Sequence, residues 1–189
     1  ALLNLAPDHL DRYPNADVYY AAKARMFTNM SRRDKIVLRT DVARVHCVRD
    51  ALPEDGGNPV LFSSESDGGA DFFLDAEGML TMRTDDGDQP LLDRKKLRLR
   101  GNHNIENALA AIAVCTAAGC VPSDIAAALP SFAPYPHRIE LVAVRDGIHV
   151  INDSKATNPD AMCRALEAVG EDGGKVLLIA GGLDKGLVF

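Results

Sequence analysis

Apolar residues follow different periods in different segments of the chain, and these periods predict its secondary structure. Residues 2–5 ("LLNL") and 35–40 ("KIVLRT") are short apolar runs, which predict two buried strands. Between them, apolar residues within 18–30 recur at spacings of three and four, which predicts a helix. Asp17 stands just ahead of this segment and is the candidate N-cap of the helix.

The middle of the chain changes from a β-like to a helical pattern. From residue 59 to residue 100, short apolar runs alternate with Gly and Asp turns, which favours hairpins over helices. Residues 101–119 ("GNHNIENALAAIAVCTAAG") predict the clearest helix, with Asn104 at its start and Gly119 at its C-terminal stop. A second short helix is expected from Ser123.

The last part of the chain has the order strand, helix, strand. Residues 139–144 and 147–152 predict strands joined by the turn "RDG", a helix follows from Asn158, and 175–182 ("KVLLIAGG") predict a buried strand. This order is typical of a parallel α/β unit. A buried parallel strand needs helices on both faces of its sheet, so we expect the chain to be cut from a longer protein after residue 189, and also ahead of residue 1.

A proline-rich segment separates these two parts. Three prolines fall within residues 130–136, which suits a linker better than a helix or a strand, and we place a domain boundary near residues 133–136. Arg138 follows directly. A lone arginine is usually a solvated surface charge, but at a hinge between domains it could reach into a cleft from either side.

Composition restricts the class of partner. The chain is 47% hydrophobic and 25% charged, as an ordinary globular protein is, and its net charge of -6 argues against nucleic acid as a partner. No apolar run approaches the roughly 18 residues of a membrane span, and no basic and apolar leader opens the chain, so we expect a cytoplasmic protein without a membrane partner. The four cysteines form no CxxC pair, which favours plain thiols over zinc or disulfides: Cys47, Cys115, Cys120 and Cys163.

Residues 150–161 ("VINDSKATNPDA") carry more polar groups than a change of direction needs. The start of a helix explains residues 158–160, an N-cap followed by proline and an acidic residue. It does not explain Asp153 and Lys155, which lie after a strand and ahead of a helix N-terminus, where open α/β sheets bind ligands. Lys155 and Thr157 could hold phosphate or carboxylate oxygens there, with Asp153 orienting the lysine.

Two residues near the start of the chain are candidates for a metal site. His9 lies between carboxylates in "DHLDRY", a set that suits a divalent ion but gives too few ligands by itself, and a hydrogen-bonded loop is the alternative. Lys23 lies on the flank of an apolar helix face, where a lysine whose stem covers apolar surface is the ordinary interpretation.

Three further polar residues have both a structural and a functional interpretation. Asn104 could simply cap its helix, but together with Asn107, one turn later, it could present amides to a heterocyclic base. Lys185 follows a Gly-Gly pair in "IAGGLDKG", which by itself indicates a turn.

Taken together, these segments resemble the Mur ligase family. The matching motifs occur in the family's order over nearly the whole chain, whereas residues 41–99 contribute little. The bend "NDSKATN" is most similar to the branch that adds D-glutamate. The motifs are "NLAPDHLDRY", "AAKARMF", "GNHNIENALAA", "PHRIE", "INDSKATN" and "GGLDKG".

The resemblance implies an α/β fold with two parts. Residues 1–134 would be the C-terminal part of a central ATPase domain, a parallel sheet with helices and a small antiparallel β region. Residues 135–189 would begin a Rossmann-like C-terminal domain. In this family ATP phosphorylates the carboxylate of a UDP-linked substrate, here UDP-N-acetylmuramoyl-L-alanine, and the nitrogen of the incoming amino acid, here D-glutamate, attacks the acyl phosphate. The resemblance thus implies a ligase of peptidoglycan precursor synthesis, which we expect to be monomeric.

The resemblance also implies a role for each candidate residue. His9 matches a magnesium-ligating histidine, and Lys23 matches a lysine that is carbamylated in the family, which would supply oxygen ligands for Mg²⁺. Asn104 and Asn107 match residues that contact the adenine of ATP. Those that match C-terminal-domain groups closing on ATP are Arg138, Asp153 and Lys155. The contacts to the incoming glutamate are Thr157 and Lys185.

The chain also departs from the family pattern. It contains no GTNGK[ST] phosphate loop and nothing that matches the domain for the uridine nucleotide, so we expect these 189 residues alone to be inactive. Small differences in "FAPYPHR" and "NPDA" leave L-glutamate open as the amino acid added. A folylpolyglutamate-type ligase and a truncated, non-catalytic binding module remain as alternatives. A nicotinamide-dependent enzyme is disfavoured, because no GxGxxG follows an early strand.

Overall fold

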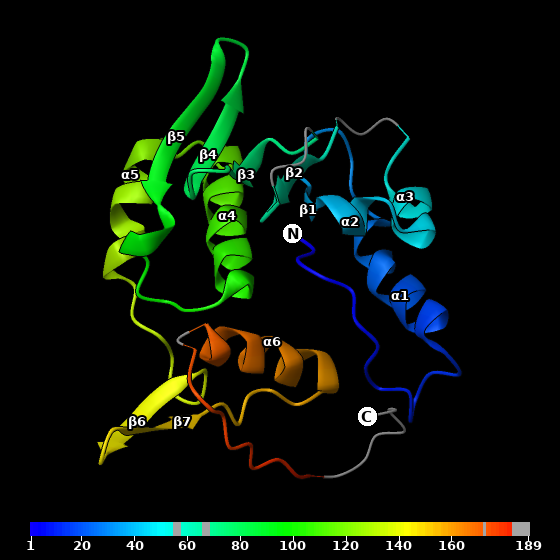
Figure 1. Cartoon of the computed structure of the whole chain (residues 1–189). Helices are drawn as coiled ribbons and strands as arrows, with labels where there is room; N and C mark the ends of the chain where they lie inside the picture. The colour runs from blue at the N-terminus through cyan, green and yellow to red at the C-terminus, as the bar shows by residue number, and fades with distance from the viewer. Residues whose placement is uncertain (55–57, 66–68, 172, 183–189) are drawn as a thin grey trace.

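A computed structural model of the chain describes residues 1–54, 58–65, 69–171 and 173–182, and its larger part is built on a mixed five-stranded sheet (Figure 1). The strands lie in sequence order, with β1, β2 and β3 parallel and β3, β4 and β5 antiparallel. Their bounds are β1 Val37–Arg39, β2 Val60–Ser63, β3 Phe72–Leu74, β4 Met79–Thr84 and β5 Gly87–Asp93.

The strands predicted within residues 59–100 are therefore present, but only β3 to β5 form the expected antiparallel meander. The hairpin prediction is wrong for β2, which pairs in parallel with both β1 and β3. The apolar runs of β2 and β3 are nearly continuous rather than alternating, and this is the pattern of parallel strands buried on both faces.

Two helices cover this sheet. Helix α4 (Asn102–Ala117) packs against β1, β2 and β3, and α5 (Pro122–Ala128) packs against α4 and β5. The α4 helix and the sheet share one hydrophobic core, in which Phe62, Leu109 and Ile112 are fully buried. Short 3-10 turns follow β5 and α5, at η2 (Arg94–Lys96) and η3 (Leu129–Ser131).

A second, smaller core lies beside β1. It gathers the α1 helix (Ala16–Ala24), the 3-10 turn η1 (Arg25–Phe27), α2 (Thr40–Ala43) and α3 (His46–Ala51) around Phe27, Leu38 and Val48. Nothing in the sequence pattern had predicted α2 or α3.

Two details at this end of the chain differ from prediction. Asn15 rather than Asp17 caps α1, because its side-chain oxygen accepts the hydrogen bond from the Val18 amide, at 3.0 Å. The strand expected at residues 2–5 is a single parallel bridge between Leu2 and Leu38. Leu2 is buried and Leu5 packs half-buried against the core, whereas Leu3 is exposed.

The remaining part of the chain begins with a two-stranded hairpin, β6 (Glu140–Arg145) and β7 (Ile148–Asn152). Asp146 and Gly147 at its tip have positive φ angles of 50° and 79°, as expected of a tight hairpin turn. Within the part of the chain that the structure describes, neither face of the hairpin is covered: side chains from both faces are exposed, among them Leu141, Val142, Val144 and Ile148.

Helix α6 (Pro159–Gly170) follows and confirms the predicted helix start. The side-chain oxygen of Asn158 accepts from the Ala161 amide at 2.8 Å, Pro159 is the first helical residue, and Asp160 lies in the first turn. Gly170 is the last residue of the helix.

The buried strand predicted at residues 175–182 is not formed. This segment belongs to no helix or strand, and Leu177 and Ile179 are 91% and 93% exposed. The exposed fractions of Val176 and Leu178 are about half as large. Side chains therefore alternate as in a strand, but no described strand lies alongside to supply the hydrogen bonds and cover that would bury them.

The predicted α/β class is confirmed by this arrangement of helices on a mixed sheet whose first three strands are parallel. All four cysteines are free thiols, two of them half-buried and two exposed. None of the described helices combines the length and the apolar character that crossing a membrane requires.

Candidate active site where helix α6 meets helix α4

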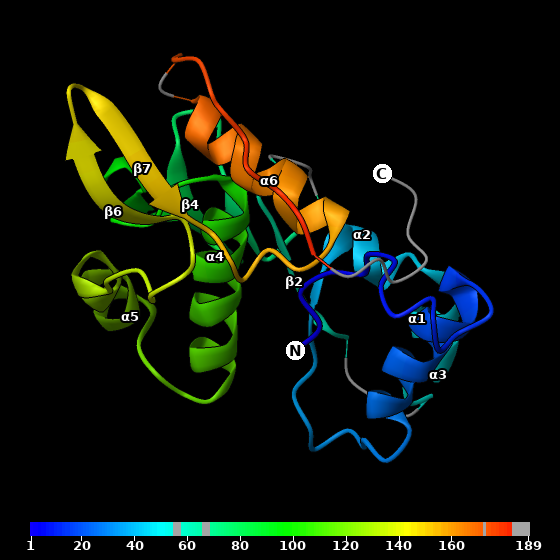
Figure 2. The ribbon, with the colours of Figure 1, turned by 90° about the horizontal axis from the view of Figure 1, so that it is seen from below.

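Helix α6 lies across the N-terminal end of α4 and close to the loop that opens the chain (Figures 1 and 2). Three contacts hold it there, and we call them the α6 seat: Asn158 with Asp8, Arg164 with Glu106, and Ala168 with Gly101. They join residues more than 50 positions apart, and they bring the bend at residues 153–158 next to the polar loop at residues 8–13.

In the first contact of the seat, the side-chain amide of Asn158 uses both its oxygen and its nitrogen. The oxygen of Asn158 caps α6, while its nitrogen donates to a carboxylate oxygen of Asp8 at 3.3 Å. Asp8 also accepts from the backbone amide of His9 at 2.8 Å. The residue that starts α6 is thus fixed to the residue beside the predicted metal ligand.

The third contact depends on a glycine. Gly101 is the N-cap of α4, with φ 85° and ψ 152°, a conformation that residues with a Cβ rarely adopt. A Cβ at this position would lie 2.6 Å from the Cβ of Ala168 and 2.9 Å from the His103 ring. The absence of a side chain at Gly101 therefore permits the close approach of the two helices.

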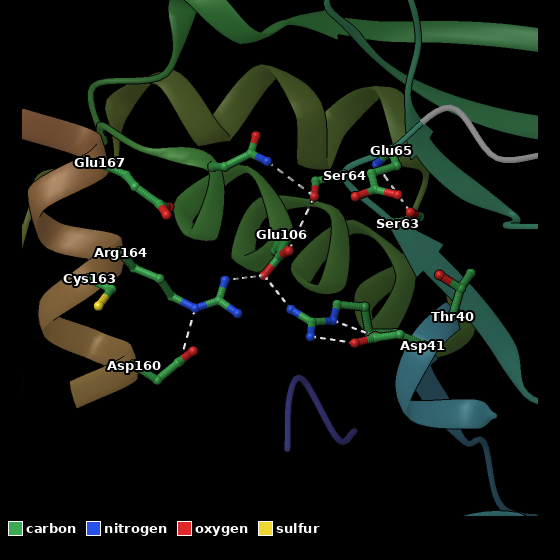
Figure 3. A pocket seen from close by; sticks show the side chains of 12 residues that line it. Thr40, Asp41, Ser63, Ser64, Glu65, Glu106, Asp160, Cys163, Arg164 and Glu167 are labelled. Atoms are coloured by element: carbon green, nitrogen blue, oxygen red, sulfur yellow. Dashed lines mark hydrogen bonds and ion pairs between the residues drawn. The ribbon is translucent and has the colours of Figure 1, made fainter. Parts of the chain in front are cut away.

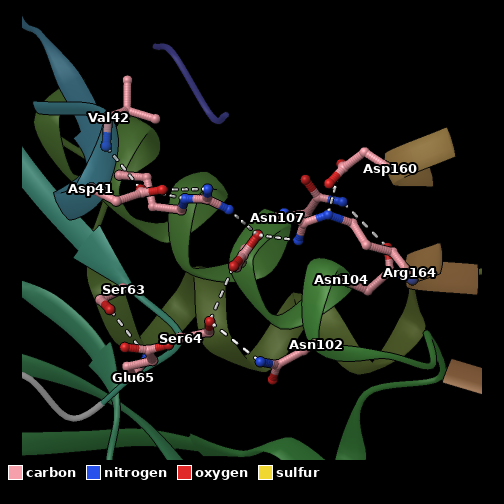
Figure 4. A network of polar contacts seen from close by, with 12 residues as sticks. Asp41, Val42, Ser63, Ser64, Glu65, Asn102, Asn104, Asn107, Asp160 and Arg164 are labelled. Carbon is pink, nitrogen blue, oxygen red and sulfur yellow. Dashed lines mark hydrogen bonds and ion pairs between the residues drawn. The ribbon is translucent and has the colours of Figure 1, made fainter. Parts of the chain in front are cut away.

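Asn104 is not the N-cap of α4, so the structural interpretation of this residue is wrong. The helix begins at Asn102, and the side chain of Asn104 donates to the Arg100 carbonyl at 2.6 Å. Asn107 donates in turn to the side-chain oxygen of Asn104 at 3.3 Å. The two amides predicted to contact adenine therefore lie together on one face of α4, with Asn107 exposed (Figure 4).

His103 lies in the first turn of α4, close enough to the bend for the charge of Asp153 to affect its pKa. Its Nε2 is 3.0 Å from the Asn104 amide nitrogen, and a ring that accepts this hydrogen bond must be neutral. Burial, followed by the positive charge of Arg164, lowers the pKa of His103 below its usual value, against the opposing effects of Asp153 and Glu106. The ring thus favours its neutral form at the junction of the two parts.

A set of hydrogen bonds, which we call the polar clamp, closes the base of the β6–β7 hairpin. Asp153 accepts from the Ile139 amide at 3.2 Å, and the Lys155 amide donates to the His137 carbonyl at 3.2 Å. The Glu140 carboxylate accepts from the backbone amide of His137 at 2.7 Å, and the side-chain nitrogen of Asn152 lies 2.9 Å from Nδ1 of the His137 ring.

The polar clamp gathers three of the predicted nucleotide-binding residues, Arg138, Asp153 and Lys155. It holds the backbone on either side of Arg138 against the bend that carries Asp153 and Lys155. The side chains of Arg138, Lys155 and Thr157 are exposed and therefore accessible to a ligand. Lys185 lies outside the described residues.

His9 and Lys23 meet around one aromatic ring. The His9 ring packs edge-on against Tyr19 with 6.0 Å between ring centroids, and the Lys23 nitrogen lies 5.0 Å from the centroid of the same ring. His9 has a positive φ of 55°, is 46% exposed at its side chain, and has its Nε2 3.9 Å from an Asp8 oxygen.

Histidine and carboxylate are suitable ligands for a divalent ion, but an uncarbamylated Lys23 is a cation and cannot be one. Within the described part of the chain, no cluster of three or more His, Cys, Asp or Glu could hold a metal by itself. The donor set fits Mg²⁺ only with oxygens from elsewhere, such as a carbamate on Lys23.

A network of ion pairs that no sequence motif indicated joins α4, β1 and α6 (Figures 3 and 4). Glu106 accepts from Arg39 at 2.8 Å, from Ser64 at 3.1 Å and from Arg164 at 3.4 Å. Arg39 also makes two hydrogen bonds of 2.6 Å to Asp41. The network borders a cavity of about 360 Å³ at the carboxyl ends of β1 and β2.

Opposite charges stabilise the network, because Arg39 and its carboxylate partners each shift the pKa of the other toward the charged form. Burial, the largest influence, would raise the pKa of Asp41, but the hydrogen bond and charge of Arg39 outweigh it and lower the pKa. Burial would likewise lower the pKa of Arg39, and the carboxylates of Asp41 and Glu106 raise it instead. The signal available in the sequence was Glu106, the only Asp, Glu, Lys or Arg within α4.

Comparisons with known proteins agree with this architecture. The family model "Mur ligase middle domain" matches residues 1–115, and "Mur ligase, glutamate ligase domain" matches residues 137–187. The chain is 42% identical over 194 residues to the UDP-N-acetylmuramoylalanine–D-glutamate ligase of Desulfitobacterium hafniense. It is 38% identical over 188 residues to the ligase of the same name from Pelotomaculum thermopropionicum. Both matches cover 100% of this chain but 40% of the relative.

Solved structures share the fold at lower identity. MurF from Acinetobacter baumannii superposes with a TM-score of 0.70 at 21% identity, over 88% of this chain and 36% of that one. The apo form of L. casei FPGS has a TM-score of 0.60 at 20% identity, over 90% and 41%. The chain thus spans well under half the length of the proteins it matches.

Proposed function

The chain belongs to the Mur ligase family, and from this we propose that the whole protein joins D-glutamate to UDP-N-acetylmuramoyl-L-alanine at the expense of ATP. The observation that carries the proposal is the match of the entire chain, at 42% identity, to a relative named for this reaction. The α6 seat supports it, because it places the bend with Lys155 beside the loop with His9.

We assign residues 1–134 to the C-terminal part of a central ATP-binding domain and residues 135–189 to the start of a Rossmann-like C-terminal domain. The limits of the two matching family models, 1–115 and 137–187, support this division. So does the absence of any helix or strand between η3 and β6. We place the protein in the cytoplasm as a monomer.

The reaction builds negative charge between two anionic substrates. ATP phosphorylates the substrate carboxylate, and the amine of D-glutamate then attacks the acyl phosphate and displaces phosphate. Such chemistry needs cations and accurate placement more than a protein nucleophile. Lys155 and Arg138 supply exposed positive charge at one end of the site, and the Asp153 carboxylate, held by the Ile139 amide, fixes the bend between them.

The remaining residues bind and orient the substrates. The hydrogen-bonded pair Asn104 and Asn107 presents amide groups to adenine. Thr157 and Lys185 would bind the incoming glutamate. When the two parts close on each other, water is excluded, which protects the acyl phosphate from hydrolysis.

His9 and a carbamylated Lys23 would hold Mg²⁺. Bound magnesium supplies positive charge to the phosphate oxygens. Tyr19 positions both side chains, since its ring packs against His9 and lies under the Lys23 nitrogen.

The test is phosphate release from ATP by the full-length protein with magnesium, UDP-N-acetylmuramoyl-L-alanine and D-glutamate. We expect release to require both substrates and to yield the amide product, detected by mass. A protein that releases no phosphate under these conditions would overturn the proposal. Replacing D-glutamate with L-glutamate in the same assay decides which enantiomer is added.

A folylpolyglutamate-type ligase is the second candidate, since L. casei FPGS shares the fold of this chain. That similarity, at 20% identity, concerns the fold alone. Supplying a folate in place of the UDP-linked substrate separates the two, because a folylpolyglutamate-type enzyme would release phosphate only with the folate.

A further inference from the structure

We propose that Glu106 is a positioning residue that holds α6, and with it the bend at residues 153–158, against the ATP-binding part of the protein. In the catalytic cycle this would be the contact that fixes the closed arrangement of the two parts. The link to catalysis rests on the function proposed above, whereas the contact itself stands on the geometry.

The carboxylate of Glu106 is shared among three elements. One oxygen accepts from Arg39 at the end of β1, at 2.8 Å, and from Arg164 on α6, at 3.4 Å. The other oxygen accepts from Ser64, which follows β2, at 3.1 Å. The side chain is only 15% exposed, so water competes weakly for these hydrogen bonds.

Glu106 is the carboxylate that links α6 to the sheet, because it is the one in this network that pairs with both Arg39 and Arg164. Arg39 has a second carboxylate partner in Asp41, and Arg164 has one in Asp160, at 3.0 Å. Without the charge of Glu106, each arginine would keep a partner on its own side. The ion pair between α4 and α6 would be lost, and the two half-buried arginines would face each other across the cavity.

The position of Arg164 explains how this contact acts on the bend. Arg164 lies six residues after Asn158, about 9 Å along the helix at the usual rise per residue. Ala168, one turn further, packs on Gly101. A rigid helix held at these points carries its N-terminal end, and the bend before it, into a fixed place.

Amide hydrogen exchange on the 189-residue chain tests the contact directly. A helix of 12 residues is marginal when it is not packed, so the amides of α6 should exchange when the helix leaves its seat. We expect Glu106→Gln to speed exchange in α6 and in the bend by about tenfold, and to leave β4 and β5 unchanged.

The matched control is Glu167→Gln. Glu167 lies on α6 and borders the same cavity, and none of the hydrogen bonds described for the network ends on it. This variant should exchange as the wild type does. Arg164→Gln should reproduce the effect of Glu106→Gln, and the double variant should add little. Equal exchange in Glu106→Gln and wild type, or full additivity of the two variants, would overturn the proposal.

Steady-state kinetics of the full-length protein tests the consequence for catalysis. Neither Asn104 nor Asn107, the residues proposed to contact adenine, is a hydrogen-bond partner of Glu106 in the network, so Glu106→Gln should change KM for ATP by less than about threefold while kcat falls about tenfold. A higher KM with unchanged kcat would assign Glu106 to ATP binding instead and overturn the positioning role. If the wild type forms no product, the proposed function fails, and the exchange experiment still decides whether the contact exists.

Discussion

Replacing Gly101 with alanine should destabilise the packing of α6 on α4, and the structure separates the cost into a backbone part and a packing part. The φ and ψ angles of 85° and 152° lie in a region populated almost only by glycine, which costs alanine about 1–3 kcal/mol. The new Cβ would also lie 2.6 Å from the Cβ of Ala168, and overpacking of this kind costs about 1–3 kcal/mol more. We expect the free energy of unfolding to fall by about 2–6 kcal/mol.

Urea unfolding followed by far-UV circular dichroism measures this change. Gly119→Ala is the matched control, since Gly119 also has a positive φ, of 94°, but no atom within 4 Å of an added Cβ. It should cost about 1–2 kcal/mol from the backbone alone. The excess in Gly101→Ala therefore reports the contacts that the new Cβ makes with Ala168 on α6 and with the His103 ring.

A double variant separates the contact from the backbone. Combining Gly101→Ala with Ala168→Gly removes the clash between the two Cβ atoms but keeps the backbone strain. The pair should show a coupling of about 0.5–3 kcal/mol in the favourable direction. Zero coupling, or equal losses in Gly101→Ala and Gly119→Ala, would refute the reasoning that α6 is packed on this glycine.

Four further predictions concern the site. Lys155→Ala should reduce turnover of the full-length enzyme at least about a hundredfold with almost no change in the urea midpoint, because the side chain is exposed; equal loss of folding would refute its functional role. Lys23→Ala should abolish activity that bicarbonate or a small carboxylate partly restores, and no rescue together with no carbamate in the wild-type mass would refute the modification. Asn158→Ala should cost about 1 kcal/mol through the lost cap, whereas Asn158→Ser keeps a capping oxygen and loses the amide donor to Asp8 without adding charge, so its stability should stay closer to wild type in the same urea assay. The pKa of His103 is lowered in the folded chain, so the unfolded chain binds more protons around its usual pKa; the free energy of unfolding should fall as pH drops from about 7.5 through 6.5 and below, and His103→Asn should flatten that dependence.

The sequence predicted correctly those features that neighbouring residues determine by themselves. The start of α6 is an example, because Asn158, Pro159 and Asp160 act within one turn of the helix. The β6–β7 turn is another, since Asp146 and Gly147 tolerate positive φ. The N-cap of α4 could not be predicted this way. Gly101 is favoured there by its contact with Ala168, 67 positions along the chain.

In the candidate site, too, features with a local cause could be predicted and those that depend on distant contacts could not. Motif spacing gave the residues of the bend, and the structure brings that bend to the loop of His9 through Asn158 and Asp8. Whether these residues bind ATP and glutamate stays a prediction. Glu106 and its two arginines were missed because they come from three elements, and no periodicity within one element links them.

The bare β6–β7 hairpin has a consequence for how the chain opens. Two strands without a covered face have little stability of their own, and here the polar clamp and the α6 seat hold them in place. Local unfolding should therefore begin at the hairpin and bend, well before the sheet around Phe62 and Leu109 opens. The segment that carries the candidate catalytic lysine would then be an independent cooperative unit, the first to be cut by a protease and the last to become ordered.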